Sequence, residues 1–334
     1  MPETRSDITL LVTDFAFQPG DIERLRAALG PDRVLTTRDA AGLAEALANH
    51  PEADVICTLA PPARLPEVAP HLRWLALASA GADRVIEQDW LRAPNAPLVT
   101  TANGVHATNI SEHVLSAMLL WARHWPELLR LQQEHRWPVD AEKAPLAGRE
   151  LAGATLLIVG LGAIGRGIAR LGRAFGMRVL ATRRSVPVGG SDPDVDALIP
   201  QDKLGEALAE ADYIALAIPS TPETFHLIDA EQLSKVKRGA FLVNIARGDV
   251  VDEAALIAAL RNGLLGGASL DVMEHEPLPP ESPLWTAPNV TLSPHISGWT
   301  MRYSERLTDL LLDNLARYRD GRSLRNLVDV ARGY

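Results

Sequence analysis

A glycine-rich turn between an apolar run and a helical pattern limits the folds open to this chain. Residues 154–159 are apolar and partly β-branched, which predicts a buried parallel strand. Residues 163–175 carry apolar side chains at helical spacing and are followed by Gly176, a typical helix end. The turn between them reads Gly160-Leu161-Gly162-Ala163-Ile164-Gly165. A strand, a glycine turn of this spacing and a helix together predict a dinucleotide-binding βα unit.

Each glycine of this turn has a separate physical role. Gly160 permits the tight turn, Gly162 lets the backbone approach a pyrophosphate, and Gly165 lets the helix pack closely on the strand. The backbone N–H groups around Ala163 and Ile164 begin the helix and are expected to face the phosphates. The alternative interpretation is a glycine-rich turn in some other α/β protein.

The end of the next predicted strand bears on which dinucleotide binds. An NAD-selective site places Asp or Glu there, where it accepts a hydrogen bond from the ribose 2′-hydroxyl. This chain instead has Arg183, Arg184 and Ser185. Guanidinium groups suit a 2′-phosphate, so the sequence predicts a preference for NADP(H), with NAD(H) as a possible cofactor. Arginines that only solvate a surface turn are the alternative.

Composition excludes several classes of protein. The 334 residues suffice for two domains, and the net charge of −9 argues against a partner recognised through nucleic-acid phosphates. Cys57 is the only cysteine, which fits a reducing, cytoplasmic location. We expect no secretion signal and no membrane span, because the apolar runs are too short.

Short apolar runs alternate with helical patterns along most of the chain, which predicts an α/β fold with two doubly wound parallel-sheet domains. The strand candidates are 8–12, 33–37, 54–59, 73–78 and 98–103, then 154–160, 178–183, 213–218, 240–246, 267–272 and 290–294. A helix at 109–125 is apolar on more than one side and is expected to be buried between domains or against another subunit. Residues 126–150 read as an exposed arm or linker, and a helix at 301–319 is placed to cover the first domain.

Three residues with catalytic chemistry follow predicted strands in the second half. They are Arg247, Glu276 and His295. In an open parallel sheet ligands bind beyond the carboxyl ends of the strands, so the three side chains can converge on one site. Hydride transfer to a carbonyl needs a proton donor, a group that polarises the oxygen and an anchor for the substrate charge. These residue types supply all three.

With these motifs in this order, the chain resembles the D-isomer-specific 2-hydroxyacid dehydrogenases, in particular NADP-type glyoxylate/hydroxypyruvate reductases. The resemblance covers nearly the whole length and is strongest over residues 146–300. It implies a flavodoxin-like substrate domain, residues 1–102 plus 296–334, and a Rossmann-type cofactor domain, residues 103–295. It further implies a homodimer formed through a helix and arm at 109–150, and the reduction of a 2-oxo acid to a D-2-hydroxy acid.

The resemblance also implies roles for single residues. His295 is the general acid, Glu276 pairs with it, and Arg247 binds the carboxylate and the carbonyl oxygen of the substrate. Asp271 contacts the nicotinamide end of the cofactor, and no metal is expected. Further cofactor contacts are expected at Pro219 and Ala246, and further substrate contacts at Ser79, Ala80 and Gly81.

Two questions stay open at this point, the class of function and the role of Trp299. A non-catalytic, dinucleotide-sensing interaction protein on the same scaffold keeps the same residues. Trp299 stands where the family has small residues, and it either narrows the substrate pocket or packs near the domain boundary. The particular 2-oxo acid does not follow from the sequence.

Overall fold

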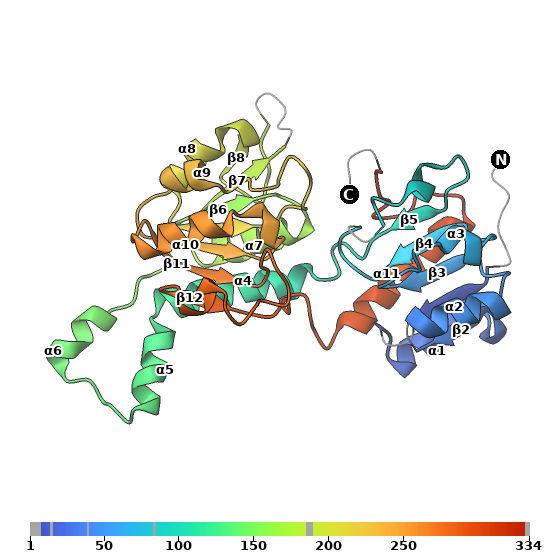
Figure 1. Cartoon of the computed structure of the whole chain (residues 1–334), viewed down its shortest axis with the longest axis horizontal. Coiled ribbons are helices and arrows are strands. Elements are labelled where there is room, and N and C mark those ends of the chain that lie inside the picture. The colour runs from blue at the N-terminus through green and yellow to red at the C-terminus, as the bar shows by residue number, and fades with distance from the viewer. Residues whose placement is uncertain (1–7, 14–15, 39, 83–84, 185–189, 331–334) are drawn as a thin grey trace. The chain divides into compact units, whose positions relative to one another are not determined.

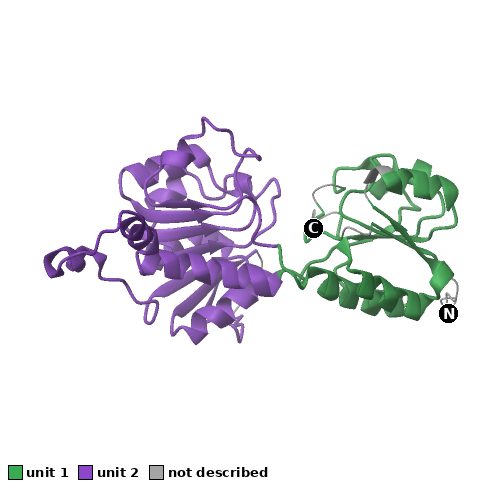
Figure 2. Ribbon diagram, turned by 90° about the horizontal axis from the view of Figure 1, so that it is seen from below, with its two compact units in different colours: residues 1–106, 299–334 green, residues 107–298 purple. Residues whose placement is uncertain are grey.

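The structure is a computed structural model that describes residues 8–13, 16–38, 40–82, 85–184 and 190–330. The chain divides into two compact units, residues 1–106 with 299–334 (unit 1) and residues 107–298 (unit 2) (Figure 2). These boundaries lie three or four residues from those expected at 102 and 295. Over the described residues, no helix combines the length and the apolar character needed to cross a bilayer.

Unit 1 is built on a five-stranded parallel sheet with the order β2-β1-β3-β4-β5. This is the order of flavodoxin-like doubly wound sheets. The strands are β1 (Leu10–Thr13), β2 (Val34–Thr37), β3 (Val55–Thr58), β4 (Trp74–Leu77) and β5 (Leu98–Thr100).

Helices cover both faces of this sheet (Figure 1). On one face, α1 (Pro19–Leu29) and α11 (Tyr303–Arg319) pack on strand residues such as Leu10 and Val12. On the other, α2 (Ala40–Asn49) and α3 (Leu65–Val68) pack on residues such as Leu11. Successive strand residues therefore face opposite layers, as the pleat requires. The expectation that the C-terminal helix covers the first domain is confirmed.

Unit 2 has seven parallel strands in the order β12-β11-β10-β9-β6-β7-β8. The chain winds outward from β6 to β8, returns to β9 beside β6, and then winds the other way. Ligands bind at such a reversal in open α/β sheets. The strands are β6 (Thr155–Val159), β7 (Arg178–Arg183), β8 (Ala197–Pro200), β9 (Tyr213–Leu216), β10 (Ala240–Asn244), β11 (Leu265–Leu270) and β12 (Val290–Leu292). The expected fold class, two doubly wound parallel-sheet domains, is confirmed.

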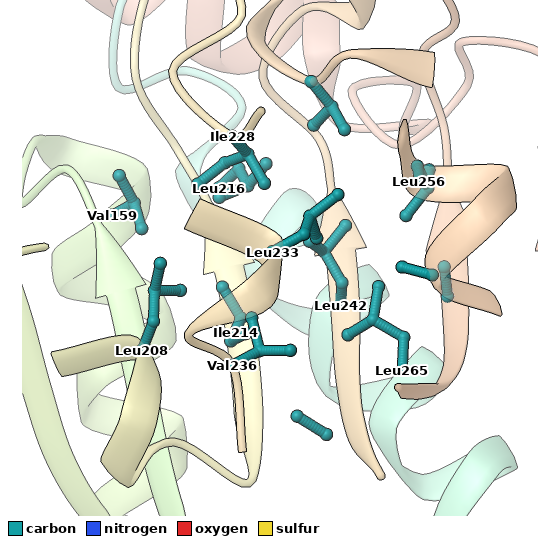
Figure 3. Close-up of a cluster of buried hydrophobic side chains, with 14 of the residues drawn as sticks. Val159, Leu208, Ile214, Leu216, Ile228, Leu233, Val236, Leu242, Leu256 and Leu265 are labelled. Carbon is teal, nitrogen blue, oxygen red and sulfur yellow. The ribbon is translucent and has the colours of Figure 1, made fainter. Parts of the chain in front are cut away.

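One face of the unit 2 sheet carries a large apolar cluster, shown in Figure 3. Leu208, Leu233 and Leu256 reach it from three short helices, and Ile214 and Leu242 reach it from the strands below. The helices are α8 (Leu204–Glu210), α9 (Ala230–Ser234) and α10 (Glu253–Arg261). This layer fixes the strands whose carboxyl ends carry the candidate site.

The opposite face is covered by α4 (Ala107–Ala122) and α7 (Ala163–Ala174). The two helices approach closely at Gly167, where an added Cβ would lie 2.2 Å from Oγ of Ser111. The expected helix at 109–125 is therefore correct in type and burial but wrong in its ends. It stops at Ala122 because His124 takes a left-handed conformation, with φ 53°, and a new helix begins at Trp125 with Pro126 in its first turn.

The segment expected as an exposed arm contains two α-helices, α5 (Trp125–Gln133) and α6 (Asp140–Lys143), and a 3₁₀ helix at Ala144–Leu146. Both α-helices project from unit 2 on an extended loop (Figure 1). Surface ion pairs run along them, including Arg130 with Glu127 and Glu134. Exposed apolar side chains accompany these charges, with Trp137 87% exposed.

Candidate active site

The glycine turn after β6 has the geometry that a pyrophosphate needs. Gly160 has φ +100°, and a Cβ there would lie 2.6 Å from the carbonyl oxygen of Ala217. A Cβ at Gly165 would lie 2.1 Å from the carbonyl oxygen of Gly160, so only glycine allows this packing. At Gly162, the residue before α7, an added Cβ would meet nothing within 4 Å. No side chain caps α7, so the turn and the N–H groups at Ala163 and Ile164 fit a dinucleotide phosphate.

Two arginines are expected to contact the adenosine ribose of the cofactor. They stand at the end of the strand beside this turn. Arg183 is the last residue of β7, which pairs with β6, and both Arg183 and Arg184 are exposed. Ser185 lies outside the described residues. Two carboxylates interact with these arginines. The charge of Arg183 helps to lower the pKa of Asp192, and the charge of Arg184 helps to lower the pKa of Glu223.

The three candidate catalytic residues follow three neighbouring strands. Arg247 follows β10, Glu276 follows β11 and His295 follows β12. These strands pair in parallel, so their carboxyl ends lie at one edge of the sheet. The glycine turn follows β6 at the same edge.

His295 and Glu276 form a hydrogen-bonded pair. Nδ1 of His295 lies 2.7 Å from Oε2 of Glu276, and Oε1 of Glu276 accepts from the backbone N–H of Met273 at 3.1 Å. The histidine has φ 51°, and its own N–H donates to the carbonyl of Asp271 at 2.8 Å. With Nδ1 on the carboxylate, Nε2 is the ring nitrogen that remains for a substrate among the described contacts.

Asp271 anchors the turn that carries His295. Its buried carboxylate accepts from Oγ of Ser293 at 2.6 Å and from the N–H groups of Ile296 and Ser297, each at 2.9 Å. Burial alone raises the pKa of Asp271, but these hydrogen bonds together outweigh it and lower the pKa. The expected contact with the nicotinamide stays a prediction, and the anchoring role was not expected from the sequence.

Arg247 is half-buried, and its Nη1 donates to the carbonyl of Ala246 at 2.7 Å. The side chain of the buried Asn244 stabilises the turn that carries Arg247. It accepts from the N–H of Ala246 at 3.0 Å and donates to the carbonyl of Arg247 at 3.0 Å. Pro219, another expected cofactor contact, follows β9 at the same edge and accepts from Oγ1 of Thr224 at 2.8 Å.

The loops that carry Arg247 and Glu276 touch through their backbones. A Cβ at Gly248 would lie 1.9 Å from the carbonyl carbon of Met273, so this contact requires glycine. Oε1 of Glu274 accepts from the N–H of Glu253 at 2.9 Å and lies 3.1 Å from Nε2 of His226. Sequence reasoning missed these supporting residues, because each acts across loops that are distant along the chain.

The expected carboxylate-binding loop lies in unit 1 and follows β4. Oγ of Ser79 donates to the carbonyl of Gly81 at 2.8 Å, and the carbonyl of Ser79 accepts from the N–H of Ala102 at 2.8 Å. The hydroxyl of Tyr303 donates to the carbonyl of Ala78, just before the loop. Ala80 is partly exposed between these anchors.

Trp299 lies largely in solvent, with 79% of its surface exposed. Across the described ranges, no group of three or more His, Cys, Asp or Glu side chains is arranged to hold a metal ion.

Comparison with known proteins places this chain in a family. Residues 115–297 match the model of the D-isomer specific 2-hydroxyacid dehydrogenase NAD binding domain. A glyoxylate reductase of Korarchaeum cryptofilum is 35% identical over 266 residues, which cover 79% of this chain and 78% of that protein. The chain belongs to the D-isomer specific 2-hydroxyacid dehydrogenase family. The resemblance inferred from the motifs is thereby confirmed.

Other proteins of this family are similar to the chain over most of its length. The glyoxylate/hydroxypyruvate reductase B of Serratia proteamaculans is 36% identical over 267 residues, 78% of each chain. The crystal structure of a D-isomer specific 2-hydroxyacid dehydrogenase from Xanthobacter autotrophicus, in complex with NADPH and MES, matches with a TM-score of 0.83. That match has 31% identity and covers 98% of this chain and 100% of the other. The expected enzyme class, an NAD(P)-dependent 2-hydroxyacid dehydrogenase, is confirmed, and a non-catalytic role is not favoured.

Proposed function

We propose that this chain reduces a small 2-oxo acid to the D-2-hydroxy acid, with NADPH as the preferred cofactor. The observation that carries the proposal is the 2.7 Å pair of His295 and Glu276, at the sheet edge that also holds the glycine turn. Glyoxylate and hydroxypyruvate are the first substrates to test, because relatives at about 35% identity carry those names.

The chain's own residues supply binding and proton transfer. Arg247 donates hydrogen bonds to the substrate carboxylate and polarises the carbonyl oxygen. When bound, the reduced nicotinamide supplies the hydride that the carbonyl carbon accepts. Nε2 of His295 donates its proton to the carbonyl oxygen, which becomes the hydroxyl, and the imidazole is left neutral. Glu276 stabilises the charged imidazole before the transfer and fixes its orientation.

Other residues bind and orient. The backbone N–H groups of Ser79, Ala80 and Gly81 are proposed as a second contact for the carboxylate. The proposed cofactor contacts are the turn from Gly160 to Gly165, Arg183, Arg184, Ser185, Pro219, Ala246 and Asp271. In this proposal unit 1 is the substrate domain and unit 2 is the cofactor domain.

Arg183 and Arg184 carry the proposed preference for NADP(H). Replacing both, as Arg183→Gln with Arg184→Gln, removes two charge-assisted contacts to a 2′-phosphate, so the Kd for NADPH should rise about tenfold or more. The Kd for NADH should change little, because NADH lacks that phosphate. Titration of both cofactors by protein fluorescence tests this, and an equal loss for the two would contradict the assignment.

We further propose a cytoplasmic homodimer. The single cysteine, Cys57, is buried and forms no disulfide among the described residues, which suits a reducing compartment. The projecting helix α5 offers exposed Trp125 and Leu129 for a second copy, and the loop between α5 and α6 offers exposed Trp137.

A further inference from the structure

Arg166 lies directly after the last glycine of the cofactor turn, in the first part of α7. Its guanidinium makes a bidentate pair with Asp192, with Nη1 to Oδ1 at 2.8 Å and Nη2 to Oδ2 at 2.7 Å. Nη1 also donates to Oδ2 of Asp194 at 3.0 Å. The side chain of Arg166 is 34% exposed and that of Asp192 only 9%, so the pair is largely shielded from water. Fork-to-fork geometry of this kind is the strongest form of an arginine–carboxylate contact.

The position of Asp192 relative to Arg183 bears on cofactor selection. The charge of Arg183 acts on this carboxylate, and Asp192 lies in the segment between β7, which ends at Arg183, and β8, which pairs with β7. An acidic side chain beside that strand end is the feature of NAD-selective sites, where it accepts from the ribose 2′-hydroxyl and repels a phosphate. Here both carboxylate oxygens are occupied by Arg166, and the hydrogen bond from Arg166 is the main reason that the pKa of Asp192 is lowered.

We infer that Arg166 is a specificity-determining residue that makes the site accept NADP(H) by neutralising Asp192. This inference rests on the proposed function. Unlike Arg183 and Arg184, Arg166 does not itself contact the 2′-phosphate in this proposal. Without Arg166, the carboxylate of Asp192 attracts Arg183 and repels the 2′-phosphate. NADH has a hydroxyl in place of that phosphate, so it loses nothing and gains an acceptor.

The test measures cofactor binding by the full chain, without substrate. In Arg166→Gln, the Kd for NADPH should rise about tenfold or more, while the Kd for NADH should stay within about twofold or fall, as removal of one charge-assisted partner implies. The double variant Arg166→Gln with Asp192→Asn should regain most of the NADPH affinity. Arg170→Gln is the matched control, because Arg170 lies on the same helix, is exposed and stands 3.9 Å from Asp194; it should bind both cofactors normally.

A purely structural ion pair gives a different pattern. In that case Asp192→Asn alone weakens binding as much as Arg166→Gln does, and both cofactors lose affinity together with the Tm. Our inference predicts instead that Asp192→Asn keeps or improves NADPH affinity, which stays measurable even if Arg166→Gln folds poorly. If the wild type prefers NADPH and Arg166→Gln binds both cofactors normally, only this inference fails. If the wild type prefers NADH, the cofactor assignment fails and the inference with it.

Discussion

Asp271 holds the turn of His295 with a buried carboxylate that accepts three hydrogen bonds. Asparagine in its place presents one acceptor and one donor, so at least one N–H in the turn loses its partner. We expect Asp271→Asn to lower the Tm, by an amount that corresponds to about 1–3 kcal/mol for an unpaired buried donor. Thermal unfolding at pH 7 tests this.

The effect of Asp271→Asn should also depend on pH. The pKa of Asp271 is lowered in the folded chain, so the ionised carboxylate contributes its full stability above the ordinary value of about 3.9. This contribution is lost as the pH falls through the lowered pKa. The difference in Tm between wild type and Asp271→Asn should therefore be constant from about pH 7 to 5 and shrink below about pH 4. A difference that grows on acidification would contradict this.

Sequence patterns could predict which residues lie at the candidate site, but not how these residues are supported. Arg247, Glu276 and His295 each follow an apolar run, so their place at strand ends was predictable. The contact of Glu274 with His226 joins two loops 48 positions apart, and the pair of Arg166 with Asp192 spans 26. Such pairs have no local spacing, because only the fold brings their loops together.

At the scale of elements, Gly248 couples the loop of Arg247 to the loop of Glu276. In Gly248→Ala, the new Cβ would overlap the backbone of Met273 and Glu274, which lie 1.9–2.3 Å away. The two loops must then separate, so we expect both a lower Tm and a large loss of turnover. Gly20→Ala is the matched control, since a Cβ there meets nothing within 4 Å, and its Tm should be unchanged or slightly higher. Normal turnover in Gly248→Ala would show that the contact is dispensable.

The longer elements were predictable because each has a clear apolar period. The strands from β1 to β12 were expected except for β8, whose four residues are only half-buried, follow Asp196 and end in Pro200. The short helices α8 and α9 were also not singled out. The division of the expected helix at 109–125 depends on the left-handed backbone of His124, which a histidine does not demand, together with Pro126 in the first turn of α5.

At the scale of the whole molecule, the proposed homodimer predicts a solution mass of twice the chain mass of 36.1 kDa. Light scattering on the full chain measures this directly. Leu129→Asp places a charge on an exposed apolar position of α5 and should shift the mass toward the monomer, while Gly20→Ala should leave it unchanged. A wild type that stays monomeric at high concentration would contradict the dimer.

In the proposed reaction, His295 protonates the carbonyl oxygen of a 2-oxo acid during its reduction. The most direct measurement is the rate of NADPH oxidation with glyoxylate, hydroxypyruvate and larger 2-oxo acids, for wild type, His295→Ala and the exposed neighbour control His275→Ala. We expect turnover by wild type and His275→Ala, and a turnover about 10²–10⁴-fold lower in His295→Ala at unchanged NADPH affinity. Turnover in His295→Ala close to that of wild type, or a wild type that binds NADPH and reduces none of these acids, would contradict the proposed reaction.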